Sequence, residues 1–423
     1  MLTAYRTLFG IVAVISVFAT AAWERNGKVN RSIHTAAADP EPGDNILTDV
    51  WETPLPIPGF RSASISDNGA FIATVSTDRH IICVRHQNGR VIWRKPNPGV
   101  TNADISSDGK TLIAYSPLDP TPAGNIITIY QGLHGESVSK FPLDGAIWNV
   151  QISSDSQTAI ITTGGHTLYS LNLNGRPAGR RWSLPGIGNS ISMTKDGRYI
   201  ALGTWDQSGV YLYDAKPDPP VPPIDEPKPS KGKSKPPSEI LIWPWTSSDT
   251  RNRLFEVQIA RDAKYILGIS YANFNRTNPK VYLWKFDRTP QWKEPLDLGA
   301  DASSPTAVIT ANGRYVVLSY VSTVSHGDQV LETKHLIVYN RVGRQVLYLP
   351  GFLFSPTLVA TSPDGSNVVI SDGSSKLYTV SIDGRMSSPR ALPAPIQQTI
   401  VSDDGHFVLI YTIDGNLNLM RLG

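Results

Sequence analysis

A short motif recurs eight times along this 423-residue chain and spans almost everything after residue 46. Each copy centres on an Asp or Asn followed by a small residue, at Asn68-Gly69, Asp108-Gly109, Asp155-Ser156, Asp196-Gly197, Asp262-Ala263, Asn312-Gly313, Asp364-Gly365 and Asp404-Gly405. The residue three positions earlier is large and apolar in seven copies, and the residue four positions later is apolar in all eight. Such self-similarity indicates a repeat architecture, in which each unit completes its hydrophobic core against its neighbours.

Each copy predicts a unit of four antiparallel strands. Alternating apolar residues before the centre favour a strand with one buried face. Asp-Gly and Asn-Gly adopt the positive φ of a tight hairpin turn, and the apolar run 315–318 is typical of the returning strand. A third strand such as 211–213, a second turn such as Asn88-Gly89 and a fourth strand such as 91–93 complete the unit. Four-stranded units of 40 to 52 residues predict the blades of an all-β propeller.

The two ends of the repeat region predict how the ring closes. Eight copies indicate eight blades, but the last copy leaves room for only two further strands, 406–412 and 416–422. The segment 46–51 precedes the first copy, and we expect it to form the fourth strand of the last blade. Such pairing removes an exposed strand edge at the junction. Seven blades are the alternative if the degenerate copy at Asp155 or Asp262 is not a blade.

The unit resembles the repeats of the WD-repeat-like and quinoprotein-like β-propeller superfamily, over nearly the whole chain after residue 46. The WD family ends its third strand in Trp-Asp, and the corresponding pairs here are Tyr213-Asp214, Trp284-Lys285 and Tyr339-Asn340. The family's Gly-His pair is missing, so its structural Asp–His network is not expected here. The run from Asn88 to Trp93 resembles one piece of the quinoprotein repeat, in which a Trp docks neighbouring blades. The resemblance implies the fold and leaves the function open.

The first 45 residues predict a route out of the cytoplasm. Residues 8–22 carry no charge and Ala19-Thr20-Ala21 offers an A-x-A cleavage pattern, so 1–23 is predicted to be a signal peptide or a signal anchor. A buried helix of a soluble domain is the third alternative. Residues 24–45 are polar, which favours a flexible tether. We therefore expect the propeller, 46–423, to be extracytoplasmic: periplasmic, secreted, or held by a single-pass membrane anchor.

One insertion interrupts the repeat between the copies at Asp196 and Asp262. Residues 216–238 contain nine prolines and five lysines, a composition that forbids a packed strand and favours an extended, disordered chain. A solvated loop is the simpler interpretation. The functional interpretation is a docking segment for an aromatic-lined groove or an anionic surface, through the lysines Lys228, Lys231, Lys233 and Lys235.

The first strand of each unit is expected to line the central channel of the propeller. Seven positions before each centre, where that strand enters the channel, the residues are Arg61, Thr101, Trp148, Asn189, Phe255, Pro305, Thr357 and Gln397. This ring contains one cation and neither a carboxylate nor a histidine, so we expect no catalytic residue there. The aromatic residues Trp148, Tyr271 and Phe274 fall in predicted loops, where we expect them to be exposed. From the ring and these loops, the candidate interaction surface comprises Arg61, Trp148, Asn189, Phe255, Tyr271, Phe274 and Gln397.

The remaining residue types argue against other chemistries. Cys83 is the only cysteine, so neither an intrachain disulfide nor a cysteine-based metal site can form. The eight histidines form no H-x-H or H-E-x-x-H pair, and no glycine-rich motif opens a helix that would cradle a phosphate. We expect no cofactor and no metal. A net charge of +3 gives no case for a nucleic-acid partner.

Three functions are compatible with these features. The favoured one is a non-catalytic scaffold at the cell envelope, which binds protein partners across one propeller face and meets the membrane through its N-terminal segment. The second is a periplasmic enzyme of the lactonase, lyase or quinoprotein kind, with reactive residues supplied by loops. The third is a sensor ectodomain that modulates a membrane partner.

Overall fold

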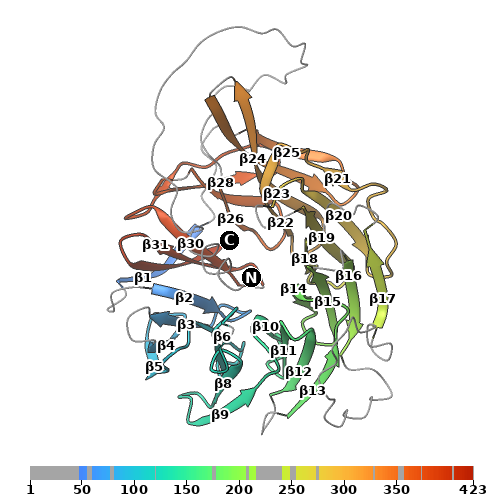
Figure 1. Cartoon of the computed structure of the whole chain (residues 1–423). Coiled ribbons are helices and arrows are strands. Elements are labelled where there is room, and N and C mark those ends of the chain that lie inside the picture. Colours follow the sequence, from blue (N-terminus) through green and yellow to red (C-terminus); the bar gives the residue numbers. More distant parts are fainter. Residues whose placement is uncertain are drawn as a thin grey trace. The chain divides into compact units, whose positions relative to one another are not determined.

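Each of the eight repeat copies folds into one four-stranded antiparallel sheet, and the sheets form the blades of a ring-shaped propeller (Figure 1). The computed structural model describes residues 47–54, 60–76, 81–119, 121–173, 178–205, 209–215, 241–247, 254–272, 276–326, 329–350, 357–372, 374–402 and 404–422. Every regular element within these ranges is a strand. No helix among the described residues has the length and hydrophobicity to cross a membrane. The chain divides into two units, Met1–Pro40 and Glu41–Gly423, and all described residues belong to the second.

Blades 1 to 4 follow each other along the chain, and each begins with its channel-lining strand. Blade 1 comprises β2 (Phe60–Ile65), β3 (Phe71–Ser76), β4 (Ile81–His86) and β5 (Val91–Pro96). Blade 2 comprises β6 (Asn102–Ile105), β7 (Thr111–Tyr115), β8 (Ile126–Gln131) and β9 (Ser137–Pro142). Blade 3 comprises β10 (Ile147–Ile152), β11 (Thr158–Thr163), β12 (Thr167–Asn172) and β13 (Ala178–Ser183). Blade 4 comprises β14 (Gly188–Met193), β15 (Tyr199–Thr204), β16 (Gly209–Asp214) and β17 (Leu241–Thr246).

Blades 5 to 8 have the same strand order, and two of them end in very short outer strands. Blade 5 comprises β18 (Leu254–Ile259), β19 (Tyr265–Tyr271), β20 (Lys280–Lys285) and β21 (Leu296–Asp297). Blade 6 comprises β22 (Ala302–Ile309), β23 (Tyr315–His326), β24 (Gln329–Asn340) and β25 (Gln345–Pro350). Blade 7 comprises β26 (Thr357–Thr361), β27 (Asn367–Ser371), β28 (Lys376–Ser381) and β29 (Arg390–Ala391). Blade 8 comprises β30 (Ile396–Val401), β31 (Phe407–Thr412), β32 (Asn416–Leu422) and β1 (Leu47–Pro54).

The Asp or Asn at the centre of each copy closes the first hairpin turn of a blade. In blade 7 the Ser362 hydroxyl donates to Asp364 Oδ1 at 2.7 Å and accepts the N–H of Asn367 at 3.0 Å. The two copies that lack glycine form the same turn, since Ser156 and Ala263 adopt φ values of 61° and 55°. All eight copies are therefore blades, and the seven-blade alternative does not apply.

The ring closes through the chain segment that precedes the first repeat, as predicted. Strand β1 pairs antiparallel with β32, which sets Leu47 opposite Leu422 and Pro54 opposite Asn416. Leu47 is buried against the last blade. From blade 7, Arg390 donates to the Leu47 carbonyl at 2.9 Å and forms an ion pair with Asp49. The N-terminal strand therefore joins the last blade and also contacts its neighbour.

The hydrophobic core lies between neighbouring blades. Between blades 4 and 5, Leu212 and Trp243 of one sheet pack against Phe255 and Trp284 of the next, and all four are buried. The indole N–H of Trp243 crosses the same boundary and donates to the Phe286 carbonyl at 2.8 Å. Because each apolar face is covered only by the adjacent blade, no blade can complete its core alone.

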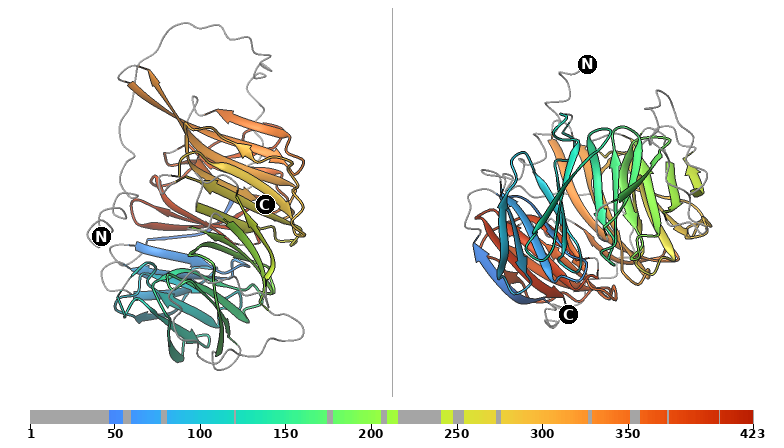
Figure 2. Two further views of the ribbon diagram at one scale, coloured as in Figure 1. Left: turned by 45° about the vertical axis from the view of Figure 1, so that its right-hand side comes forward. Right: turned by 90° about the horizontal axis from the view of Figure 1, so that it is seen from below.

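Blade 6 carries a projecting hairpin. Its strands β23 and β24 contain 12 residues each, about twice the usual strand length here. Residues 324–326 and 329–331 pair only with each other, because the ladders of β22 and β25 end at Ser322 and His335. The left view of Figure 2 shows this hairpin in orange, extending beyond the rest of the blade.

Several predicted segments lie outside the described residues. They are the signal segment 1–23, the tether 24–45 and the insertion 216–238 with its four lysines. The insertion falls between β16 and β17 of blade 4, where the repeat predicts it.

Candidate functional site

The channel is lined by the first strand of every blade, and polar side chains tie some of these strands together. Asn149 of β10 donates to the Gly188 carbonyl of β14 at 3.0 Å. Ser192 of β14 accepts the N–H of Ile259 in β18 at 2.9 Å. Such bonds satisfy backbone groups at strand edges that would otherwise face the channel unpaired.

Four of the predicted channel-entry residues occupy β-bulges. The register of the first hairpin shifts by one residue at Arg61, Trp148, Asn189 and Gln397. A bulge leaves one residue without a ladder partner, and it redirects that side chain. The position seven residues before the centre therefore marks the end of the channel at which the first strands begin, which we call the entry mouth. The opposite end, at the Asp and Asn turns, is the turn mouth.

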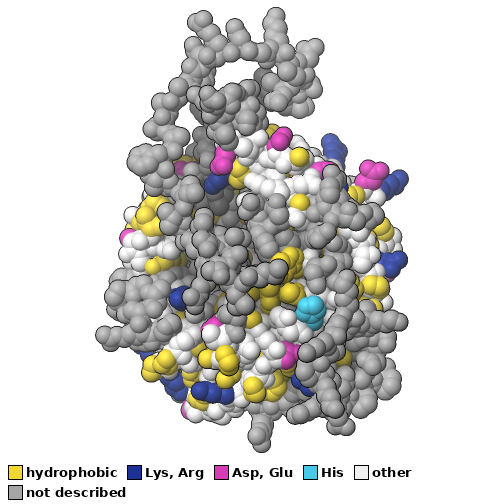
Figure 3. All heavy atoms as spheres, in the orientation of Figure 1, with side chains coloured by type: hydrophobic (Ala, Val, Ile, Leu, Met, Phe, Trp, Pro, Cys, Tyr) yellow, Lys and Arg dark blue, Asp and Glu magenta, His cyan; other side chains and the backbone are white. Residues whose placement is uncertain are grey.

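Two tryptophans meet at the entry mouth. The rings of Trp148 in β10 and Trp205 after β15 lie 5.5 Å apart at an angle of 42°, and both are half-buried. Behind them Trp205 packs against Ile269 and Tyr271 of blade 5. Gly164 lies beside the first indole, since a Cβ at that position would sit 3.2 Å from Trp148 Nε1. Figure 3 shows hydrophobic side chains and a histidine near the centre of the propeller face, close to β14 in Figure 1.

An acidic residue continues this cluster towards the channel. The Tyr271 hydroxyl donates to Glu256 Oε1 at 2.8 Å, and Arg276 forms an ion pair with the other carboxylate oxygen. The Arg276 guanidinium lies 5.1 Å from the centre of the Tyr271 ring. Burial, and next the charge of Glu256, raise the pKa of Tyr271 well above its ordinary value, so its hydroxyl stays protonated. We call Trp148, Trp205, Glu256, Tyr271 and Arg276 the entry-mouth cluster.

The structure brings several predicted site residues together and separates others. Asn189 donates to the Phe255 carbonyl at 3.0 Å, and this hydrogen bond links blade 4 to blade 5 beside the entry-mouth cluster. Phe255 itself is fully buried in the core. Arg61 and Gln397 are exposed on blades 1 and 8.

The expected loop positions of the aromatic candidates were wrong where the structure describes them. Tyr271 ends strand β19 and is only 5% exposed, because β19 runs one residue beyond most second strands to pair with Leu254. Trp148 lies in β10 and is half-buried. Phe274 lies outside the described residues.

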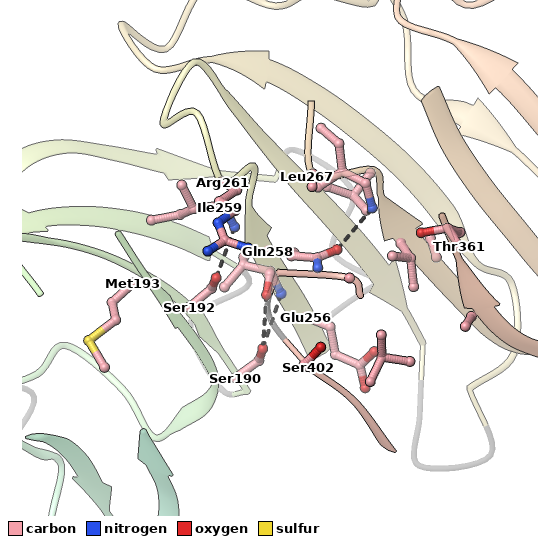
Figure 4. A pocket seen from close by; sticks show the side chains of 18 of the residues that line it. Ser190, Ser192, Met193, Glu256, Gln258, Ile259, Arg261, Leu267, Thr361 and Ser402 are labelled. Carbon is pink, nitrogen blue, oxygen red and sulfur yellow. Dashed lines mark hydrogen bonds between the residues drawn. The ribbon is translucent and has the colours of Figure 1, made fainter. Parts of the chain in front are cut away.

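A cavity of about 490 Å³ occupies the channel on the side of blades 3 to 8. Figure 4 shows Ser190, Ser192 and Gln258 on its wall, where dashed lines mark their bonds to neighbouring strands. Glu256, near the start of β18, lines the cavity towards the entry mouth. Arg261, in the turn that follows β18, lines it towards the turn mouth. Its volume lies within the range of small-ligand sites.

Reactive groups occur at two places away from the entry-mouth cluster. Burial raises the pKa of Asp104 in β6 to about 7, against the opposing hydrogen bond from the Tyr115 hydroxyl at 3.1 Å. On blade 6 the Ser322 hydroxyl lies 2.7 Å from His335 Nε2, and His335 Nδ1 lies 2.9 Å from the Tyr348 hydroxyl. Burial lowers the pKa of His335. Among the described residues, no group of three or more His, Cys, Asp or Glu side chains is placed to hold a metal ion.

Glu256, the acidic member of the cluster, is not among the predicted site residues for an identifiable reason. The predicted ring holds the residues seven before each centre, whereas Glu256 lies six before its centre, on the opposite face of the strand. At that position Glu256 is the only charged residue among the eight copies, which is a usable signal. Trp205 and Arg276 lie between strands and carry no repeat signal.

Comparisons with known proteins identify the fold. No family model matches this sequence, and no curated protein sequence matches it. Among solved structures, the chain is similar to the Dos1 propeller, with a TM-score of 0.61 and 11% identity over 89% of this chain and 96% of that one. It is also similar to BamB from Moraxella catarrhalis, with a TM-score of 0.53 and 12% identity over 89% of this chain and 98% of that one.

A third similar structure is Kuenenia stuttgartiensis hydrazine synthase, with a TM-score of 0.50 and 13% identity over 77% of this chain and 96% of that one. The names of these three proteins describe different proteins, and the feature that all three share with this chain is the β-propeller fold. At identities this low, the likeness shows the fold alone.

Proposed function

We propose that this protein is a non-catalytic interaction scaffold that binds a protein partner at the entry mouth of its channel. The Trp148–Trp205 pair carries the proposal. Tryptophan is enriched in binding hot spots because it offers a large, rigid apolar surface together with one hydrogen-bond donor. Two half-buried indoles side by side provide such a surface at the centre of a propeller face.

The position of Trp148 favours binding because its backbone and its ring are both held in place. A bulge in β10 directs the side chain, and Gly164 leaves room for the indole. A side chain that is ordered before binding loses little conformational entropy when a partner arrives.

The charged members of the cluster support a role without catalysis. Both oxygens of Glu256 are already bonded, one by Tyr271 and the other by Arg276. Fixed donors on both oxygens hold this carboxylate in one orientation. Glu256 in turn positions Tyr271 and Arg276 within the cluster, which is a structural role in the proposed binding site.

The proposed location is extracytoplasmic, at the cell envelope. Its support is the uncharged segment 8–22, which contains an A-x-A pattern at 19–21, and the polar tether 24–45. A propeller held by such a tether would meet its partners on the extracytoplasmic side of the membrane.

Site-specific photo-crosslinking in intact cells tests the proposal. The probe p-benzoylphenylalanine replaces Leu118, which is 37% exposed and whose N–H bonds the Ile147 carbonyl at 2.8 Å, next to Trp148. The matched control carries the same probe at Val342, which is 68% exposed in a turn at the opposite end of the blades. We expect a discrete protein adduct in the envelope fraction from position 118 only.

Trp148→Ala in the probe-bearing chain is expected to reduce that adduct at least tenfold, because truncating a hot-spot tryptophan costs about 2 kcal/mol or more. Equal adducts from both probe positions would refute a site at the entry mouth. An undiminished adduct in the Trp148→Ala chain would refute the tryptophan pair as its anchor.

A further inference from the structure

The two walls of the channel cavity differ in character. Blades 3 to 5 contribute most of the polar side chains, among them Gln151, Ser190, Ser192, Glu256 and Gln258, together with apolar ones such as Ile191 and Leu267. Blades 6 to 8 contribute mainly apolar side chains, among them Ala307, Val308, Leu358 and Val401. A ligand that fills this cavity therefore meets a more polar side and a more apolar side.

The backbone edges in the channel differ in the same way. Side chains of the preceding blade bond the backbone of β14, β18 and β22, as Gln258 does to the N–H of Ile309 at 2.9 Å. Among the described residues, no side chain bonds the backbone of β26 or β30. An unpaired strand edge next to an apolar wall is suited to an added extended chain, whose main chain pairs while its side chains find pockets.

Two cations stand at the turn mouth without partners. Lys195 and Arg261 precede the centres of blades 4 and 5 and line the cavity. Both are exposed, and within the described part of the chain neither side chain makes an ion pair or a hydrogen bond. The adjacent carboxylates of Asp196 and Asp262 are bonded within their own turns. The free cations therefore suit a carboxylate, which forms short, charge-assisted bonds with both side-chain types.

The length of the cavity suits a short segment of chain. Glu256 and Arg261 are five residues apart, which corresponds to about 16 Å at about 3.3 Å per residue. A peptide of about five residues fits this length, supplies N–H groups to an unpaired strand edge, and ends in a carboxylate.

We propose that the channel binds the C-terminal tail of a partner protein as an extended strand. The terminal carboxylate lies at Arg261 and Lys195, the main chain follows the edge of β26, and apolar side chains pack against Val308 and Ala360. Glu256 belongs both to the entry-mouth cluster and to the cavity wall, whereas the tryptophan pair does not line the cavity, so variants of Trp148 and of Arg261 test the two sites separately.

Binding of synthetic peptides to the full chain tests this inference. The probes are a library of N-terminally labelled pentapeptides with apolar residues at alternating positions and at the C-terminus, each made as a free acid and as an amide. Fluorescence anisotropy measures their affinity. We expect the best acids to bind at least tenfold more tightly than their amides, because the amide removes the charge that Arg261 and Lys195 attract.

The variants separate the site from general effects of charge and folding. Arg261→Gln is expected to abolish the preference for acids, and Arg344→Gln to leave it intact, since Arg344 is exposed in a turn of blade 6 and does not line the cavity. Val308→Trp is expected to weaken binding of acids and amides alike, because Val308 is half-buried and lines the cavity, and the Tm of the variant checks its folding. Trp148→Ala is expected to leave peptide binding unchanged.

Three outcomes would overturn the inference. They are a library in which no acid exceeds its amide, a preference for acids that survives Arg261→Gln, and a preference that Arg344→Gln removes equally well. A normal acid preference in a chain whose photo-crosslink at position 118 has failed would leave this site standing without the entry-mouth proposal.

Discussion

Replacing Leu47 by Ala tests whether the N-terminal strand closes the ring. Leu47 is 3% exposed and belongs to a core cluster with Leu392 of blade 7 and with Met420 and Leu422 of blade 8. A Leu→Ala change in a core costs about 2–5 kcal/mol, because the lost transfer free energy adds to the cost of the cavity. The side chains of blades 7 and 8 around Leu47 are fixed by their own sheets, so the cavity left by the substitution cannot collapse. We therefore expect the free energy of unfolding to fall by about 3 kcal/mol.

Thermal unfolding followed by tryptophan fluorescence measures the loss. Unfolding entropy of about 2.1 cal/mol/K per residue gives about 0.8 kcal/mol/K for a propeller of about 380 residues, so the Tm should fall by about 4 °C. Val50→Ala is the matched control, because Val50 lies in the same strand but is 37% exposed. Its Tm should fall by less than about 1 °C, since surface substitutions usually change stability by under about 0.5 kcal/mol. Equal shifts in the two variants, or none in either, would refute closure by β1.

Two further substitutions test the turn and the buried carboxyl. Ala263→Gly should stabilise the protein by about 0.5–1 kcal/mol, measured by urea titration. Alanine at a φ of 55° costs about 1–2 kcal/mol, and the greater freedom of glycine in the unfolded state offsets about 0.4–1 kcal/mol of the gain. A loss of stability would contradict this reasoning. Burial raises the pKa of Asp104 from 3.8 to about 7, so the folded state binds more protons than the unfolded state between these values and loses stability as pH rises through them. Asp104→Asn should therefore raise the Tm relative to the unmodified protein more at pH 8 than at pH 5, and a gain independent of pH would count against the raised pKa.

The fold could be predicted because its determinants are local. The turn at Asp364 needs only Ser362 and Asn367, which lie within a few residues of it. Strand alternation is equally local, so one blade can be recognised from about 40 residues of sequence. Even the closing strand is implied by counting, because the last copy ends one strand short.

The candidate site could be predicted only in part. Seven positions before each centre, the sequence correctly indicates the entry to the channel, since Arg61, Trp148, Asn189 and Gln397 all lie on bulges there. It could not indicate that Asn189 would be used to bond the next blade. That role depends on which backbone carbonyl lies opposite the amide across a blade boundary.

The sequence by itself determined the architecture: eight hairpin-based sheets, their order, and the strand that joins the two ends of the propeller. Those features follow from periodicity and turn chemistry, which act between residues close in the chain. Tertiary structure alone decided the sites, because Trp148 of blade 3 meets Trp205 of blade 4 only when these blades pack side by side. Glu256 likewise meets Arg276 only when the strands of blade 5 have paired. It also decided that one side of the channel is more polar and the other more apolar, since that contrast arises from strands up to 250 residues apart in the chain.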